Sequence, residues 1–101
     1  YTNNRLLNLG YYHFENENDE EAQRIWNAAL NLKPRVAARA AVNLAWFYEK
    51  EGNFSSAKAL LEAALKTLQA NNINDNLSVY TDYIKRLEKR IQDETKIMEQ
   101  L

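Results

Sequence analysis

The 101-residue sequence contains no cysteine, one proline and only two glycines. The lack of cysteine excludes disulfides, thiolate nucleophiles and cysteine-ligated metals. The scarcity of glycine and proline argues against a sandwich or barrel, because the short strands of such folds are joined by many tight turns. With 46% hydrophobic and 27% charged residues, the chain has enough apolar side chain for one folded domain, and long helices are the expected structure.

A strong charge of one sign is also missing, since 13 basic residues oppose 14 acidic ones. The formal charge of −1 supplies no field that would gather nucleic acid or anionic lipid, so neither is expected as a partner. No apolar run approaches the roughly 20 residues of a membrane-spanning helix, and we expect a soluble domain. The chain begins at Tyr1 without a signal segment, which is typical of a piece of a longer protein.

The sequence does contain a pattern of small and large residues that repeats at a spacing of 35 positions. The matched pairs are Leu9 and Leu44, Gly10 and Ala45, Ala22 and Ala57, Trp26 and Leu61, and Ala29 and Ala64. Apolar residues recur every three or four positions on both sides of a polar break, which predicts two helices in each unit. We place the first repeat at residues 3–36 and the second at residues 37–70.

The helices of the two repeats are expected at about residues 3–15, 19–32, 35–50 and 55–70. Asp19 and Ser55 are predicted to cap helix starts, because their side-chain oxygens can accept hydrogen bonds from free backbone N–H groups. Gly52 fits a left-handed turn position, and Pro34 either ends the second helix or opens the third.

One long helix is predicted in the last segment, residues 76–101. Its apolar residues recur in alternating steps of three and four from Leu77 to Leu101, with Glu94 as the single interruption. The first half of this helix is expected to cap the repeats. Its second half runs past the body, where the candidate residues for self-association are Ile91, Ile97, Met98 and Leu101. A frayed end, or contacts with residues outside this chain, is the alternative.

At these residues the sequence resembles the tetratricopeptide repeat (TPR) family. The first unit matches the family signature at Leu6, Leu9, Gly10, His13, Ala22, Trp26 and Pro34, and the second at Ala41, Leu44, Ala45, Tyr48, Ala57 and Leu61. The departures are His13 for a tyrosine, Glu17 for a turn glycine and Gln69 for the second proline. The resemblance implies an all-α superhelix of about five helices: two helix-turn-helix repeats and one long closing helix.

The resemblance also implies a concave groove that binds a peptide or protein segment and is lined by the first helix of each unit. It places this groove on Asn4, Leu7, Asn8, Tyr11, Phe14, Arg39, Val42, Asn43, Trp46 and Glu49. Aromatic rings and amides suit a peptide, although the rings are equally explained by packing against a neighbouring repeat. The expected function is a non-catalytic adaptor or scaffold. The alternative is an architectural module that associates through its apolar ends and closing helix.

A chaperone-type carboxylate clamp is not expected, because Leu7 and Tyr11 occupy slots where a lysine and an asparagine are needed. No enzymatic activity, metal or cofactor is expected either, since the sequence offers no nucleophile with a base, no glycine-rich phosphate loop and no metal-ligand set. His13, the only histidine, is interpreted as a partly buried structural residue. The asparagine-rich array loosely resembles repeat portions of bacterial cell-envelope lipoproteins, which favours the envelope or periplasm over the cytoplasm.

Overall fold

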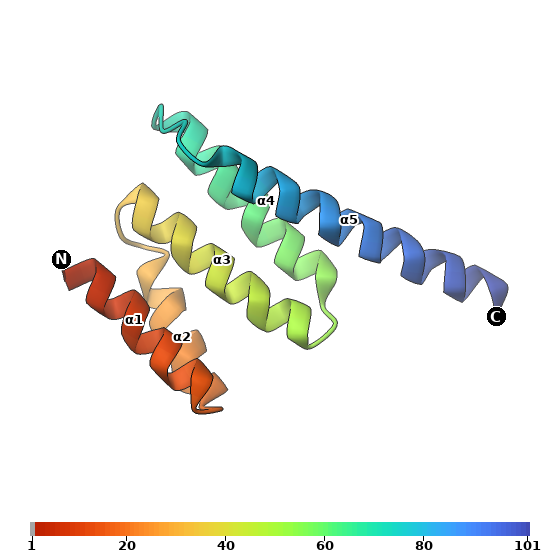
Figure 1. Ribbon diagram of the computed structural model, residues 1–101, viewed down its shortest axis with the longest axis horizontal. Helices are drawn as coiled ribbons and strands as arrows, with labels where there is room; N and C mark the ends of the chain where they lie inside the picture. Colours follow the sequence, from red (N-terminus) through yellow and green to blue (C-terminus); the bar gives the residue numbers. More distant parts are fainter. Residues whose placement is uncertain (1) are drawn as a thin grey trace.

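The computed structural model describes the backbone of residues 2–101 and the side chains of residues 5–101. Within these residues the chain forms five α-helices and no strand (Figure 1). The helices are α1 (Thr2–Glu15), α2 (Asp19–Ala29), α3 (Pro34–Lys50), α4 (Phe54–Ala70) and α5 (Leu77–Gln100). Each helix packs against the next one along the chain, so the expected all-α fold of five helices is confirmed.

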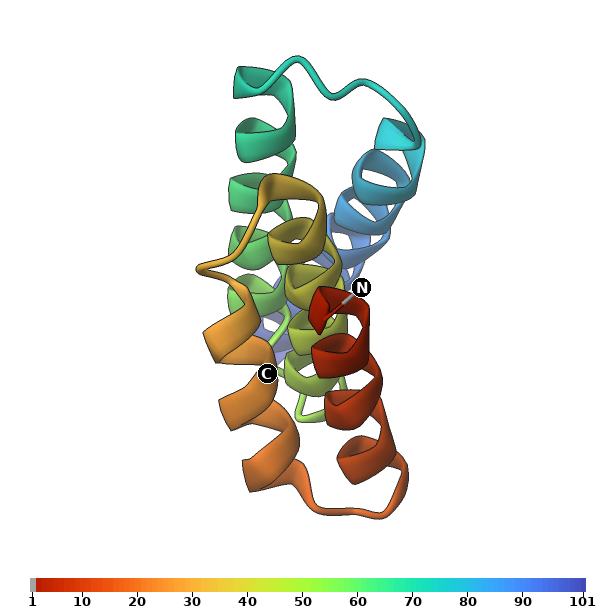
Figure 2. The ribbon, with the colours of Figure 1, turned by 90° about the vertical axis from the view of Figure 1, so that its left-hand side faces the viewer.

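The helices are arranged as a flat slab that measures 50 × 35 × 17 Å. Figure 2 shows α2 and α4 on one side of the slab and α1, α3 and α5 on the other. Helix α1 also contacts α3 directly. The C-terminal end of α5 extends beyond the α3–α4 hairpin and stands away from the body (Figure 1).

The turns between the helices refine the expected boundaries. Helix α2 ends at Ala29, earlier than the expected residue 32. The N–H groups of Asn31 and Leu32 bond to carbonyls three residues back, which is the pattern of a 3₁₀ turn and not of an α-helix. Lys33 then takes an extended backbone, as residues before proline prefer, and Pro34 opens α3 as its first residue. Gly52 has φ of +80°, so the predicted left-handed turn is confirmed.

The two predicted helix caps are wrong in detail. Asn53, and not Ser55, caps α4, and its side-chain oxygen accepts a hydrogen bond from the N–H of Ser56 at 3.3 Å. Asp19 does not cap α2 but is its first helical residue. Its carboxylate lies 3.6 Å from the ammonium nitrogen of Lys50, which links the start of α2 to the end of α3.

The N-terminal core is built around Trp26 of α2, which is fully buried. The indole Nε1 donates a hydrogen bond to the carbonyl oxygen of Leu7 at 3.3 Å. Gly10 lies directly against the ring, and a Cβ at this position would stand 2.6 Å from the ring carbon Cδ1. The glycine therefore allows α1 to approach α2 closely. Leu44 of α3 completes this cluster from the neighbouring repeat.

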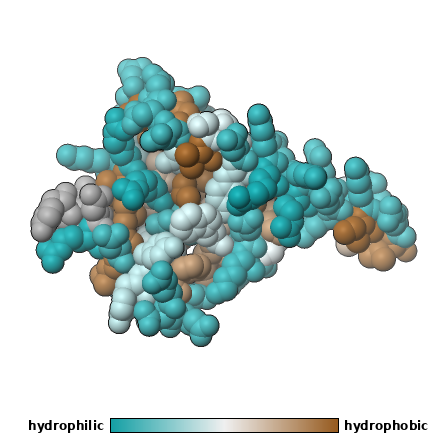
Figure 3. All heavy atoms as spheres, viewed as in Figure 1, coloured by the Kyte–Doolittle hydropathy of each residue, from teal (hydrophilic) through white to brown (hydrophobic). Residues whose placement is uncertain are grey.

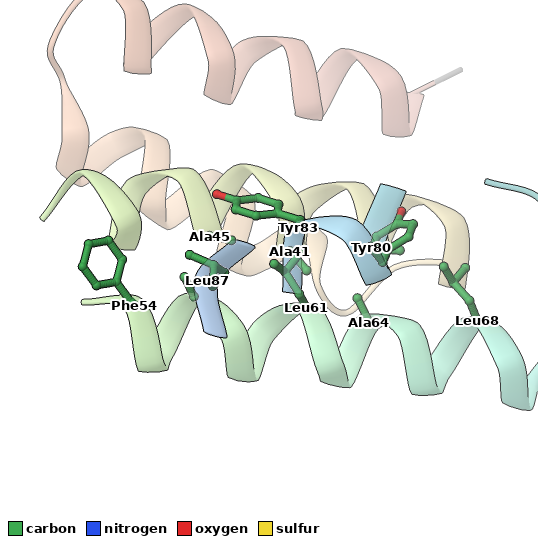
Figure 4. Close-up of a cluster of buried hydrophobic side chains, with 11 residues drawn as sticks. Ala41, Ala45, Phe54, Leu61, Ala64, Leu68, Tyr80, Tyr83 and Leu87 are labelled. Atoms are coloured by element: carbon green, nitrogen blue, oxygen red, sulfur yellow. The ribbon is translucent and has the colours of Figure 1, made fainter. Parts of the chain in front are cut away.

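A second core joins α3, α4 and α5. Its centre is Leu61 of α4. This side chain packs closely against α3 because the facing residues there, such as Ala41 and Ala45, are small. Figure 4 shows Tyr83 and Leu87 of α5 beside these groups. The first half of α5 is therefore part of the body of the protein.

The five residue pairs of the sequence repeat agree in burial except for one. Gly10, Trp26 and their counterparts in the second repeat are all buried. Leu44 is also buried, but its counterpart Leu9 is 47% exposed. The difference arises because, among the described helices, none covers that face of α1, whereas the corresponding face of α3 meets α1 and α2.

Replacing Gly10 with alanine is expected to destabilise the fold, because the new methyl group would overlap the buried Trp26 ring. Overpacking of this kind costs about 1–3 kcal/mol, and each kcal/mol lowers the melting temperature of a domain of this size by about 4–8 °C. Thermal unfolding followed by circular dichroism measures the effect. The exposed Glu15→Ala exchange on the same helix is the control, and a Gly10→Ala variant as stable as this control would contradict the packing described.

Candidate functional site

A hollow of about 310 Å³ lies between α1 and α3. It is lined by Leu7, Asn8 and Tyr11 from α1 and by Arg39, Asn43 and Trp46 from α3. All six residues belong to the groove that the sequence predicted. Leu7 is buried and forms the floor, since it also belongs to the N-terminal core. The other five give the hollow two aromatic rings, two amides and one guanidinium group.

A row of aromatic rings connects the core to this hollow. The buried Trp26 lies 5.7 Å from Phe14, measured between ring centroids, and Phe14 lies 6.3 Å from Tyr11. Tyr11 in turn meets Trp46 edge to face at 6.3 Å and an interplanar angle of 77°. Tyr11 is 41% and Trp46 36% exposed. The outer two rings are thus held in place by packing while part of their surface faces solvent.

The polar side chains of the hollow include two amides and one guanidinium group, those of Asn8, Asn43 and Arg39. No hydrogen bond or ion pair within the described part of the chain engages Asn8, Asn43 or Arg39, and no acidic residue lines the hollow. Each amide offers both a donor and an acceptor. Arg39 also lies near Tyr80 of α5, where its positive charge opposes the rise that burial causes in the pKa of that phenol.

The other residues of the predicted groove do not line the hollow. Phe14 is half-buried between Tyr11 and Trp26, and Val42 packs against the α3–α4–α5 core. Both are half-buried because the helices turn these side chains toward their neighbours. The side chain of Asn4 lies outside the described residues.

Glu49, the last residue of the predicted groove, instead forms hydrogen bonds that link α3 to α5. The Tyr83 hydroxyl donates a hydrogen bond to Glu49 Oε1 at 2.7 Å, and Arg86 Nη2 donates to the same oxygen at 3.2 Å. The Arg86 guanidinium also lies 4.3 Å from the centroid of the Tyr83 ring. Burial, and then the hydrogen bond to Glu49, raise the pKa of Tyr83.

The end of α5 presents the apolar residues that the sequence proposed for self-association. Ile97, Met98 and Leu101 are 59%, 70% and 94% exposed. Figure 3 shows an apolar patch at this projecting end. Ile91 differs from the expectation, because it is half-buried and packs against the α3–α4–α5 core. The body of the protein therefore reaches one turn further along α5 than expected.

The sequence predicted neither a metal site nor a membrane-spanning helix. No group of three or more histidine, aspartate or glutamate side chains in residues 5–101 is arranged to hold a metal ion. His13 is half-buried, with Nδ1 3.3 Å from the Asn18 amide nitrogen. Among the described helices, none combines the length and the apolar character needed to cross a membrane.

Over residues 2–101 the geometry defines an all-α fold of five sequentially packed helices with a polar and aromatic hollow between α1 and α3. The model of the family described as domain of unknown function DUF6340 matches residues 10–89, and the chain belongs to this family. Comparisons with curated proteins and with solved structures found no match. The matched range includes Tyr11, Arg39 and Trp46 of the hollow and ends before Ile97 and Met98.

The Tyr83 contact predicts a loss of stability at high pH. The pKa of Tyr83 is raised above the ordinary value of 10.0, so the stabilisation is complete below pH 10 and declines as the pH rises further. The reason is that the unfolded chain releases the phenolic proton first. We expect the melting temperature to fall above pH 10.

The Tyr83→Phe variant is the comparison for this prediction. At pH 8 its free energy of unfolding should be about 1 kcal/mol lower than that of the original chain, because it lacks the hydrogen bond to Glu49. Above pH 10 its stability should fall less steeply than that of the original chain. The measurement is the free energy of unfolding between pH 8 and pH 11. If it falls equally steeply with pH in the variant and in the original chain, the fold does not hold the phenol in its neutral form.

Proposed function

We propose that this chain is a non-catalytic interaction module that binds a peptide or protein segment in the α1–α3 hollow. The observation that carries the proposal is the Tyr11–Trp46 pair, which is exposed yet fixed by its packing on Phe14. Exposed aromatic rings that are already ordered lose little conformational freedom when a partner covers them.

The chemistry of the hollow suits a segment of polypeptide. The two rings can cover an apolar side chain, while Asn8 and Asn43 can each donate to a carbonyl and accept from an N–H of the ligand backbone. Arg39 adds a positive charge that no lining carboxylate neutralises, which favours a ligand with an acidic side chain nearby.

Catalysis is not part of the proposal, because amides and a guanidinium neither attack a substrate nor exchange a proton at neutral pH. Tyr11 has no carboxylate or histidine among the lining residues that would activate its hydroxyl.

We further propose that the helices form TPR-type repeats over residues 3–36 and 37–70. Two observations support this arrangement. The odd and even helices lie on opposite sides of the slab, and small residues such as Gly10 and Ala45 are buried where helices cross. The bacterial cell envelope is the proposed location, on the separate resemblance of the asparagine-rich array to repeat portions of cell-envelope lipoproteins.

Self-association is the second candidate function, and one observation favours it. Ile97, Met98 and Leu101 lie at the projecting end of α5 and are mostly exposed, and only Met98 also faces the turn between α3 and α4 within the described residues.

The groove is tested by selecting binders to the intact chain from a display library of random peptides. Changing either Tyr11 or Trp46 to alanine is expected to lower the affinity of the chain for the selected peptides about thirtyfold. The reason is that anchor residues contribute about 2 kcal/mol or more to binding. Circular dichroism should show nearly unchanged helical content. Tyr12→Ala, which removes an exposed ring outside the hollow, is the matched control. Full binding by both hollow variants would show that the groove assignment is wrong.

A further inference from the structure

A second hollow lies on the other layer of the slab, where the end of α2 and the start of α3 meet α4. Its volume is about 260 Å³. The lining is almost wholly apolar and includes Leu30, Leu32, Pro34, Ala37, Leu60 and Ala63. Thr67 is the only lining residue with a polar side chain. An apolar ligand group is therefore what this surface would accept.

This hollow exists because α2 is short. Helix α2 has 11 residues, whereas its neighbour in the same layer, α4, has 17. The chain leaves the helical path after Ala29, and Leu30 and Leu32 turn toward α3. The second half of α4, around Ala63 and Thr67, consequently faces a gap that a longer α2 would fill.

The rim of the hollow is positive at the start of α3. Lys33 occupies the N-cap position with its side chain exposed, and no described group bonds to it. The free N–H groups of the first turn of α3 have no side-chain cap, and no acidic residue lies in that turn. The carboxylate nearest to this turn in the described residues, Asp75, is paired with Arg35, so Lys33 and the positive end of the helix dipole leave an excess of positive charge.

The end of α5 has the complementary character. Ile97, Met98 and Leu101 are its exposed apolar residues. Between residues 93 and 99 the acidic side chains of Asp93, Glu94 and Glu99 outnumber the single Lys96. An apolar helix end with an excess of negative charge matches an apolar hollow with a positive rim.

One molecule cannot make this contact with itself. Helix α5 is continuous from Leu77 to Gln100, and its end projects on the opposite side of the molecule from the α2–α3 connection (Figure 1). The hollow can therefore receive this helix end only from a second copy of the chain.

We propose that the α5 end of one copy inserts Met98 and Leu101 into the α2–α3–α4 hollow of the next. Two different surfaces meet in this contact, so a pair of copies retains one free hollow, on the first copy, and one free helix end, on the second. The assembly is then a head-to-tail chain or a closed ring. The inference deepens the self-association candidate and is independent of peptide binding in the α1–α3 hollow.

Sedimentation of the purified chain tests the proposal. The contact is small, so association is expected between roughly 10 µM and 1 mM, the range of weak interfaces. Two variants interrupt it on opposite sides: the helix-end variant carries Met98→Gln with Leu101→Gln, and the hollow variant carries Ala63→Glu. All three positions are exposed, so both variants should remain folded, as circular dichroism and thermal unfolding would verify.

Each variant alone is expected to sediment as a monomer. An equimolar mixture should form a heterodimer and nothing larger, because it brings together only one intact hollow and one intact helix end per pair. Val79→Gln, which replaces another exposed apolar residue of α5, should associate like the original chain. Tyr11→Ala should do the same, since it alters only the peptide groove.

Three outcomes would overturn the proposal. If the original chain stays monomeric up to about 1 mM, the weak limit for such interfaces, the chain does not self-associate. Undiminished association of the hollow variant would show that the helix ends meet each other and that the hollow receives nothing. A mixture that stays monomeric would exclude the head-to-tail contact.

Discussion

The contact between Gly10 and Trp26 is the constraint on which the N-terminal half of the structure depends. The indole fills the space that a side chain at position 10 would occupy, and its N–H is satisfied by the Leu7 carbonyl. This close approach sets where α1 lies relative to α2. It also positions the site, because Phe14 packs on Trp26 and in turn supports Tyr11. The exposed aromatic pair is therefore an extension of the core.

Helix α3 connects this arrangement to the rest of the chain. Ala40 and Leu44 face the N-terminal core, whereas Ala41 and Ala45 face the core shared with α4 and α5. The same helix carries half of the α1–α3 hollow and, at Glu49, the anchor for α5. The two apolar clusters and the groove are thus parts of one packed unit, and the end of α5 is the element that lies outside it.

Local signals in the sequence were sufficient for the helices, since the periodic apolar residues predict all five. The six residues that line the α1–α3 hollow are among those that the resemblance to the TPR family implied for a groove. The early end of α2 was not predictable, since Leu30 and Leu32 continue the apolar period although tertiary packing draws them toward α3. Nor was the role of Glu49, because its partner Tyr83 is 34 positions away and no spacing rule pairs them.

The central claim is that the two tryptophans have separate roles, with Trp26 holding the helices together and Trp46 facing a partner. Nuclear magnetic resonance of the ¹⁵N-labelled chain tests this directly, because the two tryptophans supply two indole N–H signals. On addition of a peptide selected for binding, the account predicts that the Trp46 signal shifts while the Trp26 signal stays in place. A peptide that binds without moving the Trp46 signal, or that moves the Trp26 signal instead, would contradict it.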